Sequence, residues 1–202
     1  MRVVQFLCVD EAMAFYERKI IRAQKNSYLQ TVKIDSLDEM TEKIFTNQIV
    51  QLNEVELAFD TKNYFFCEIP LITIKDFYLD WRAEETQLWI IQSDAHISQR
   101  FWCSSIEKEI SMYQWAESIQ RKCCAKQWKV VIERVENSNQ LNYLCYKLDA
   151  GQAKFFNIAF QFRYKQVLLK GVFNCPYGNK KTYGVLLEAM LLANYKKILE
   201  EK

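Results

Sequence analysis

The stretch from Phe160 to Leu199 constrains the fold of this chain more than any other part of it. Apolar and polar residues alternate over 160–164, a polar step at Lys165 and Gln166 turns the chain, and a second apolar run follows over 167–175. Two such runs predict an antiparallel pair of strands. The apolar residues that come next have the three-and-four spacing of a helix face, so a helix should lie across the strands; they are Tyr183, Leu186, Leu187, Met190, Leu191 and Ile198.

Alternating residues recur upstream of this stretch and predict further strands. Together they form an antiparallel meander of four strands, over 128–135, 141–148, 154–164 and 167–175. An apolar strand over 88–92 and a long helix from Ser104 to about Ala125 precede the meander. We therefore predict an α+β fold in which an antiparallel sheet is flanked by helices as an α/β/α sandwich, with N-terminal helices added.

Helical signals come first along the chain. Residues 10–26 carry acidic side chains first and basic ones last, with their apolar residues on one face, which predicts a helix. Ser36 and Glu39 form a capping box that opens a short helix ending near Asn47. We predict a single domain over 1–202, in which a helical segment 1–48 packs on a sheet with two long helices in 49–202.

Strand signals follow the short helix. Residues 50–60 and 64–75 are typical of two strands, joined by a polar turn at 60–63. Pro70 cannot donate a ladder hydrogen bond, so it should lie at a sheet edge or mark a break in the second strand.

Charge and composition exclude several classes of partner. The 202 residues include 27 basic and 25 acidic side chains, so the net charge of +2 does not favour nucleic acid. No run of about 18 apolar residues occurs, and we expect no membrane insertion. The seven cysteines are an odd number without a C-x-x-C motif, which is typical of reduced thiols in a cytoplasmic protein.

No catalytic constellation is recognisable, and we expect no cofactor and no metal. His96 is the only histidine, whereas histidine-rich metal sites need two or more imidazoles. A nucleophilic pair of His96 with Cys103 or Cys175 is an alternative, but we favour an ordinary surface or half-buried histidine. The paired acidic residues lie in polar contexts and are interpreted as solvated surface charge.

Aromatic residues in the middle third are the one excess that points to function, because Tyr and Trp are enriched at the cores of protein interfaces. Trp89 and Trp128 lie in predicted strands and are assigned to the core. A second apolar stripe on the long helix adds further partner-binding candidates to the aromatic residues near element ends. The full set of candidates is Phe77, Trp81, Phe101, Trp102, Ile106, Ile110 and Tyr113.

The order strand, long helix, meander and helix over about 88–199 ends in V-L-L-K-G-V-F-N-C-P-Y-G-N-K-K-T-Y-G-V-L-L-E-A-M. This segment resembles the PsbP-like α/β/α sandwiches, including the bacterial DcrB-like proteins. The matching positions are Gly171, Cys175, Pro176, Tyr183, Leu187 and Met190. The resemblance implies a non-catalytic binding module, assembly factor or chaperone, a group that includes the Eag-type chaperones of type VI secretion effectors.

We therefore predict a bacterial-type cytosolic protein-binding module, either an adaptor or chaperone of a secreted effector or an immunity protein that neutralises a toxin. The alternative is a small-molecule binder, or an enzyme with a Cys, Tyr or carboxylate site between sheet and helices. A structural subunit of a larger assembly is a third reading, and homo-oligomerisation is left open. A deep pocket with converging polar groups favours the alternative, and a flat or grooved apolar surface favours a protein partner.

Overall fold

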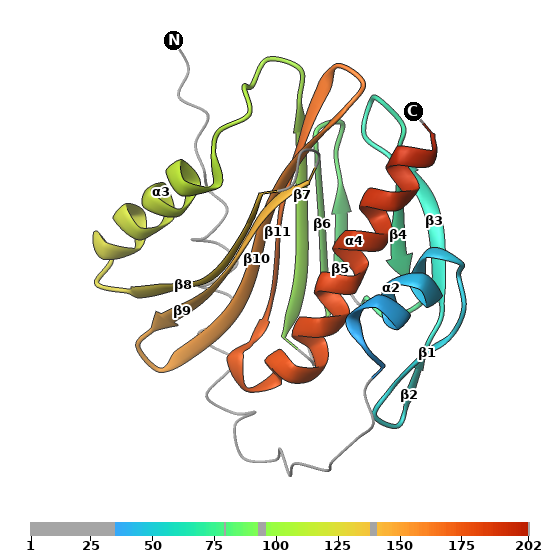
Figure 1. Ribbon diagram of the computed structural model, residues 1–202, viewed down its shortest axis with the longest axis horizontal. Helices are drawn as coiled ribbons and strands as arrows, with labels where there is room; N and C mark the ends of the chain where they lie inside the picture. The colour runs from blue at the N-terminus through green and yellow to red at the C-terminus, as the bar shows by residue number, and fades with distance from the viewer. Residues whose placement is uncertain (1–34, 79, 93–95, 138–140, 202) are drawn as a thin grey trace. The chain divides into compact units, whose positions relative to one another are not determined.

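The computed structural model describes residues 35–78, 80–92, 96–137 and 141–201 (Figure 1). All of them belong to the second of the two units into which the chain divides, 1–31 and 32–202. The predicted helix at 10–26, and with it most of the N-terminal segment 1–48, lies outside the described residues.

A seven-stranded sheet forms the centre of the described part, and every pair of neighbouring strands is antiparallel. The strand order is β5-β6-β7-β11-β10-β9-β8. The strands are β5 (Asp80–Ala83), β6 (Gln87–Gln92), β7 (Ile97–Ser104), β8 (Lys129–Asn137), β9 (Asn142–Ala150), β10 (Ala153–Tyr164) and β11 (Val167–Pro176). The four consecutive strands β8 to β11 confirm the predicted meander, and β6 confirms the predicted strand at 88–92.

The predicted long helix is wrong in its first part. Ser104 is the last residue of β7, which pairs with β6 and β11, residues 105–111 form a loop, and the helix α3 covers only Met112–Cys124. The Ser104 hydroxyl does accept hydrogen bonds from the amides of Ile106 and Glu107, at 3.2 and 3.1 Å, but the chain does not continue as a helix. The capping box that opens α3 is formed by Ser111 and Gln114 instead.

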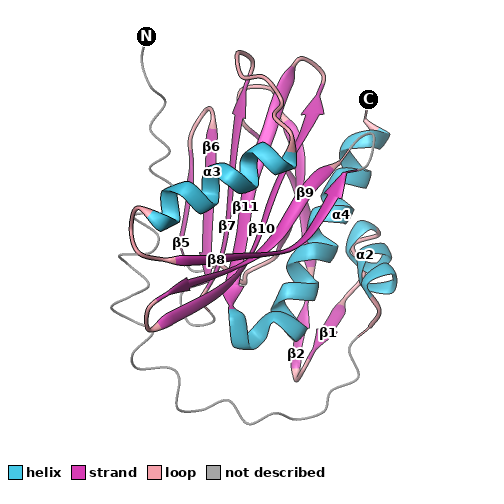
Figure 2. Cartoon of the chain, turned by 60° about the vertical axis from the view of Figure 1, so that its left-hand side comes forward, coloured by secondary structure: helices cyan, strands magenta, loops and turns pink. Residues whose placement is uncertain are grey.

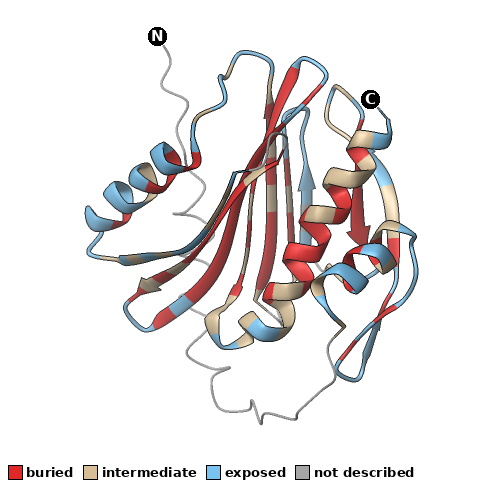
Figure 3. Ribbon diagram, viewed as in Figure 1, coloured by how far each residue is buried: buried red, intermediate tan, exposed pale blue. Residues whose placement is uncertain are grey.

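The helix α4 (Val185–Glu200) covers one face of the sheet, as Figures 1 and 3 show. It follows a 3₁₀ turn at Tyr177–Asn179 and a π-helical turn at Lys180–Gly184. Leu187, Leu191 and Ile198 pack in the core cluster of the sheet, whereas Leu186 and Met190 pack in a second cluster on the other side of the helix. Because α4 is covered on both sides, it is apolar nearly all round.

The outer cover of α4 consists of a helix and two small sheets. These elements are α2 (Leu37–Phe45), β1 (Val50–Leu52), β2 (Val55–Leu57), β3 (Phe59–Tyr64) and β4 (Ile69–Ile74). The capping box at Ser36 and Glu39 confirms the predicted start of α2. The side chain of Asn194 on α4 accepts a hydrogen bond from the amide of Ile72 at 2.7 Å and donates to its carbonyl at 3.2 Å. This amide therefore satisfies backbone groups of β4 and joins the small sheet to α4.

The predicted turn at 60–63 is wrong, because these residues lie inside β3. The chain reverses over 65–68 instead, where Phe65 and Glu68 have φ of 69° and 50°. Such left-handed backbone in residues other than glycine carries little sequence signal. Pro70 lies opposite Asn63 in a two-stranded sheet, so it does occupy an edge strand.

Three phenylalanines fill the contact between the sheet and α4. The rings of Phe101, Phe160 and Phe173 lie with centroids 4.9 to 5.8 Å apart in edge-to-face pairs. The neighbouring Gly171 leaves the space for this cluster, since a Cβ there would lie 2.2 Å from Cζ of Phe160. Phe101 is therefore a core residue, and its prediction as a partner-binding residue is not supported by its 1% exposure.

The opposite face of the sheet carries α3 (Figure 2). Trp115 of α3 contacts Trp102 of β7, with ring centroids 6.3 Å apart, and the ammonium of Lys170 lies 5.9 Å from the Trp115 ring. Trp102 and Lys170 alternate along their strands with the residues that face α4. Helices therefore lie on both faces of an antiparallel sheet, and the predicted α+β class is confirmed.

Candidate protein-binding surface

The loop between β7 and α3, residues 105–111, is held against the sheet by buried polar side chains; we call it the Ile106 loop. Lys170 of β11, which is 5% exposed, pairs with the Glu107 carboxylate at 2.5 Å. Gln161 of β10 is fully buried, and its amide donates to the carbonyl of Ile110 and accepts from the Ile110 amide at 3.4 Å. A buried ammonium is costly unless it is paired, so the loop and the sheet depend on each other here.

Two further contacts fix the end of the Ile106 loop. The side-chain amide of Asn142 donates to Glu109 at 2.8 Å, and Arg163 lies 3.9 Å from the same carboxylate. These residues come from β9 and β10, so the loop is tied to three neighbouring strands of the sheet. Both contacts are exposed and contribute less than the Lys170 pair.

The fixed loop presents apolar groups to solvent. Ile106 is 91% exposed and Tyr113, at the start of α3, is 65% exposed. Ile110 and Trp102 are half-buried beside them in sequence. Four of the predicted partner-binding residues thus belong to one segment, 102–113, although Ile106 and Ile110 lie in a loop and not on a helical stripe.

The remaining predicted residues do not join this segment. Phe77 packs edge-to-face on Tyr78, with centroids 5.2 Å apart, and contacts the clusters on the α4 side of the sheet. Phe101 is in the core. Trp81 lies in β5, and its side chain is outside what the structure describes.

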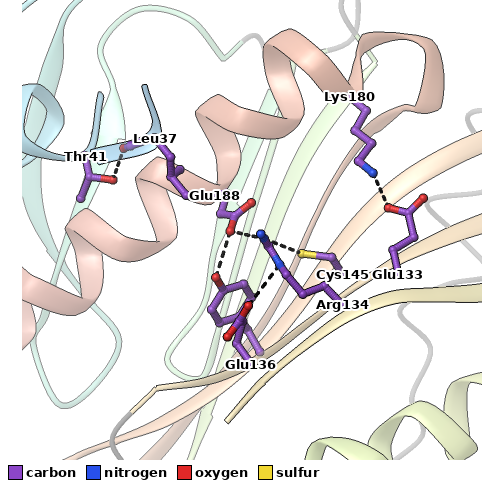
Figure 4. Close-up of polar contacts among 9 residues, drawn as sticks. Leu37, Thr41, Glu133, Arg134, Glu136, Cys145, Lys180 and Glu188 are labelled. Atoms are coloured by element: carbon purple, nitrogen blue, oxygen red, sulfur yellow. Dashed lines mark hydrogen bonds and ion pairs between the residues drawn. The ribbon is translucent and has the colours of Figure 1, made fainter. Parts of the chain in front are cut away.

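A polar cluster, in which Glu188 is buried and the Arg134 side chain is 41% exposed, joins α4 to the strands β8 and β9 (Figure 4). Glu188 of α4 contacts the guanidinium of Arg134 and accepts a hydrogen bond from the Tyr143 hydroxyl at 2.9 Å. Arg134 also donates to the sulfur of Cys145 at 3.4 Å. Each of these side chains is engaged by another, which indicates a structural role in fixing α4 on the sheet. Sequence reasoning missed Glu188, whose only signal is an acidic residue within an apolar helix.

The buried thiols of Cys103, Cys145 and Cys175 do not have the properties of nucleophiles. Burial raises the pKa of Cys145 to about 11 and that of Cys175 to about 12. Burial, together with the nearby Cys67, raises the pKa of Cys103 to about 12. These thiols are therefore protonated at neutral pH, which argues against a catalytic pair of His96 with Cys103 or Cys175.

The described residues were also compared with what a metal site and a membrane-spanning helix require. They contain no cluster of three or more His, Cys, Asp or Glu side chains able to hold a metal ion. Within 35–78, 80–92, 96–137 and 141–201, no helix has both the length and the apolar content that crossing a bilayer requires.

No family model and no curated protein matches the sequence. Among solved structures, the chain is similar to the Ran-binding protein Mog1p of Saccharomyces cerevisiae, with 12% identity and a TM-score of 0.42 over 71% of this chain and 93% of that one. It is also similar to a mutant of protein Mog1, with 12% identity and a TM-score of 0.40 over 70% of this chain and 92% of that one.

Proposed function

We propose that this chain is a non-catalytic protein-binding module that docks through the Ile106 loop, with Ile106 and Tyr113 as its main contacts. Single exposed isoleucines are common and need no explanation by themselves. The observation that carries the proposal is that two buried polar side chains hold the loop that exposes Ile106: Lys170 pairs with the Glu107 carboxylate, and Gln161 bonds the Ile110 backbone. Binding to a fixed loop loses less conformational entropy than binding to a loose one.

The chemistry of the loop defines the partner surface that fits it. The exposed Ile106 fits an apolar socket, and the exposed Tyr113 adds a flat aromatic face with a hydroxyl for the rim. The exposed side chains between them, Lys108 and Glu109, have opposite charges. The expected partner is therefore a folded protein with an apolar pocket and a polar rim of mixed charge.

Site-specific photo-crosslinking in the native cell tests this proposal. A photo-reactive residue at position 106 should join the chain to one protein in high yield. The same residue at position 131 is the control, because Val131 is 56% exposed but lies on the edge strand β8. Equal yields of the same adducts from both positions would show that the loop has no special role.

Within protein binding, we propose a finer role: the chain is either an adaptor or chaperone of a secreted effector, or an immunity protein against a toxin. We also propose that its fold is PsbP-like. The finer role is supported by the nearly neutral charge and the protonated, buried thiols described above. The six cysteines of the described part are all free, which supports a reducing compartment such as the cytoplasm. A chaperone should raise the soluble yield of the crosslinked partner, whereas an immunity protein should abolish its toxicity.

A further inference from the structure

A cavity of about 360 Å³ lies between the β3–β4 hairpin and β6. Its apolar wall is formed by Leu88 and Ile90 of β6. Opposite them lie the polar residues of β3 and β4, and Tyr78 belongs to the segment between β4 and β5. The volume falls in the range of pockets that hold small molecules.

The polar wall of the cavity is already internally satisfied. Asp60 accepts a hydrogen bond from the Thr73 hydroxyl at 2.9 Å and pairs with the Lys62 ammonium at 2.9 Å. Burial acts to raise the pKa of Asp60, but the hydrogen bonds from Lys62 and Thr73 outweigh it and lower that pKa. Asp60 and Lys62 are thus both charged and neutralise each other at neutral pH.

Two further charges line the same cavity without such an arrangement. Lys75 and Asp76 are adjacent, exposed and opposite in charge. Neither side chain makes an ion pair or hydrogen bond within the described part of the chain. The Lys75 amide donates to the carbonyl of Ala58 at 2.8 Å, and Asp76 has φ of 51°, so local contacts define the backbone that carries the two charges.

Tyr78, which also lines the cavity, has a buried polar group. Its hydroxyl oxygen is shielded from solvent and has no hydrogen-bond partner among the described residues. Burial raises its pKa, so the group remains a hydrogen-bond donor at neutral pH. An unpaired buried hydroxyl is unfavourable and is explained when a ligand, or a movement that a ligand causes, supplies the partner.

We propose that this cavity binds a small zwitterion with an apolar tail, namely an apolar α-amino acid. Its carboxylate pairs with Lys75, its ammonium group pairs with Asp76, and its side chain lies on Leu88 and Ile90. The four charged residues of the wall sum to zero, which suits a ligand of no net charge. Leu88 and Ile90 belong to the face of the sheet that carries α4, and no residue of the Ile106 loop lines the cavity, so this site stands or fails separately from the docking proposal.

Titration of the full chain with L-phenylalanine, L-leucine and L-methionine, followed by amide NMR, tests the proposal. At least one of these amino acids should shift the resonances of 60–64, 73–78 and 87–92. Two analogues of phenylalanine, 3-phenylpropionate without the ammonium group and phenethylamine without the carboxylate, should bind more weakly. The proposal is overturned if no amino acid shifts these resonances at millimolar concentration, or if either analogue binds as well as phenylalanine.

Three variants then assign the contacts. Lys75→Met and Asp76→Asn should each weaken binding about threefold to tenfold. The matched surface variants Lys129→Met and Asp38→Asn should leave it unchanged. Tyr78→Phe should raise the melting temperature of the free protein. The additional rise in melting temperature on adding the amino acid should be smaller in this variant than in the wild type. Equal affinities in Lys75→Met, Asp76→Asn and the wild type would refute the assigned site.

Discussion

Glu188 is the residue whose environment departs most from what its place in an apolar helix suggests. It is 7% exposed, and its carboxylate is matched by the guanidinium of Arg134 and the hydroxyl of Tyr143. Removing one partner leaves a buried charge without compensation, which costs more than removing both.

Arg134→Met should therefore destabilise the protein by about 2 kcal/mol, because Glu188 loses its counter-ion. The double variant Arg134→Met with Glu188→Met should recover part of that loss, since no buried charge remains. Urea denaturation of the single and double variants measures both effects. A double variant no more stable than Arg134→Met alone would contradict this account of the cluster.

Glu133 makes the stability of the fold depend on pH. Burial acts to raise its pKa, but hydrogen bonds from Lys180 at 2.5 Å and Tyr177 at 2.8 Å lower it below the ordinary value of 4.5. A carboxyl with a lowered pKa stabilises the fold fully above the ordinary value, and the contribution disappears as the pH falls through the lowered one.

The difference in unfolding free energy between the wild type and Glu133→Gln should thus be constant from neutral pH to about pH 5 and should shrink as the pH falls below the ordinary value of 4.5. Denaturant titrations at several pH values measure it. If the difference is the same at both ends of the range, the Glu133 contacts do not persist in solution.

At the scale of elements, two properties of the Ile106 loop can be tested separately: how firmly the sheet holds the loop, and the contact that Ile106 makes with a partner. Lys170→Met keeps a long apolar stem at the position but removes the ion pair with Glu107. Hydrogen exchange of the amides in 105–111 should become faster, and affinity for the partner should fall although Ile106 is unchanged.

Arg163→Met is the control for this experiment, because its pair with Glu109 is exposed and 3.9 Å long. It should change neither exchange nor affinity measurably. Slow exchange in Lys170→Met would mean that the loop is held by contacts other than this ion pair.

The sequence could predict an element where residues close together in the chain determine its conformation. The strands of the meander alternate strictly and are joined by short turns, so β8 to β11 could be read from the chain. The strand β7 was not predicted, and its last residue, Ser104, is followed by a Glu three residues later and imitates a helix start. Tertiary pairing with β6 and β11 decides its conformation.

The sequence could predict the exposed residues of the candidate surface, but not the loop conformation or the buried side chains that hold the loop. Ile106, Ile110 and Tyr113 were identified by their apolar character, although on a helix that does not exist at 104–111. The anchors Lys170 and Gln161 lie 63 and 51 residues from the loop positions that they hold. A single polar residue in a strand gives no indication of a partner so distant in sequence.

At the scale of the described unit, the two proposed sites lie on different sides of the sheet. The anchors of the Ile106 loop belong to the face that carries α3, whereas Leu88 and Ile90 of the cavity belong to the face that carries α4 (Figure 2). Variants can therefore be made in one site without touching the other, and each proposal can be tested by itself.

The affinity of the crosslinked partner for Ile106→Ala tests the central claim most directly. Titration calorimetry should give a Kd at least about tenfold higher than that of the wild type, because a central apolar contact is lost. Val131→Ala, on β8, should bind within about twofold of the wild type. A correctly folded Ile106→Ala that binds as tightly as the wild type would contradict docking through the Ile106 loop.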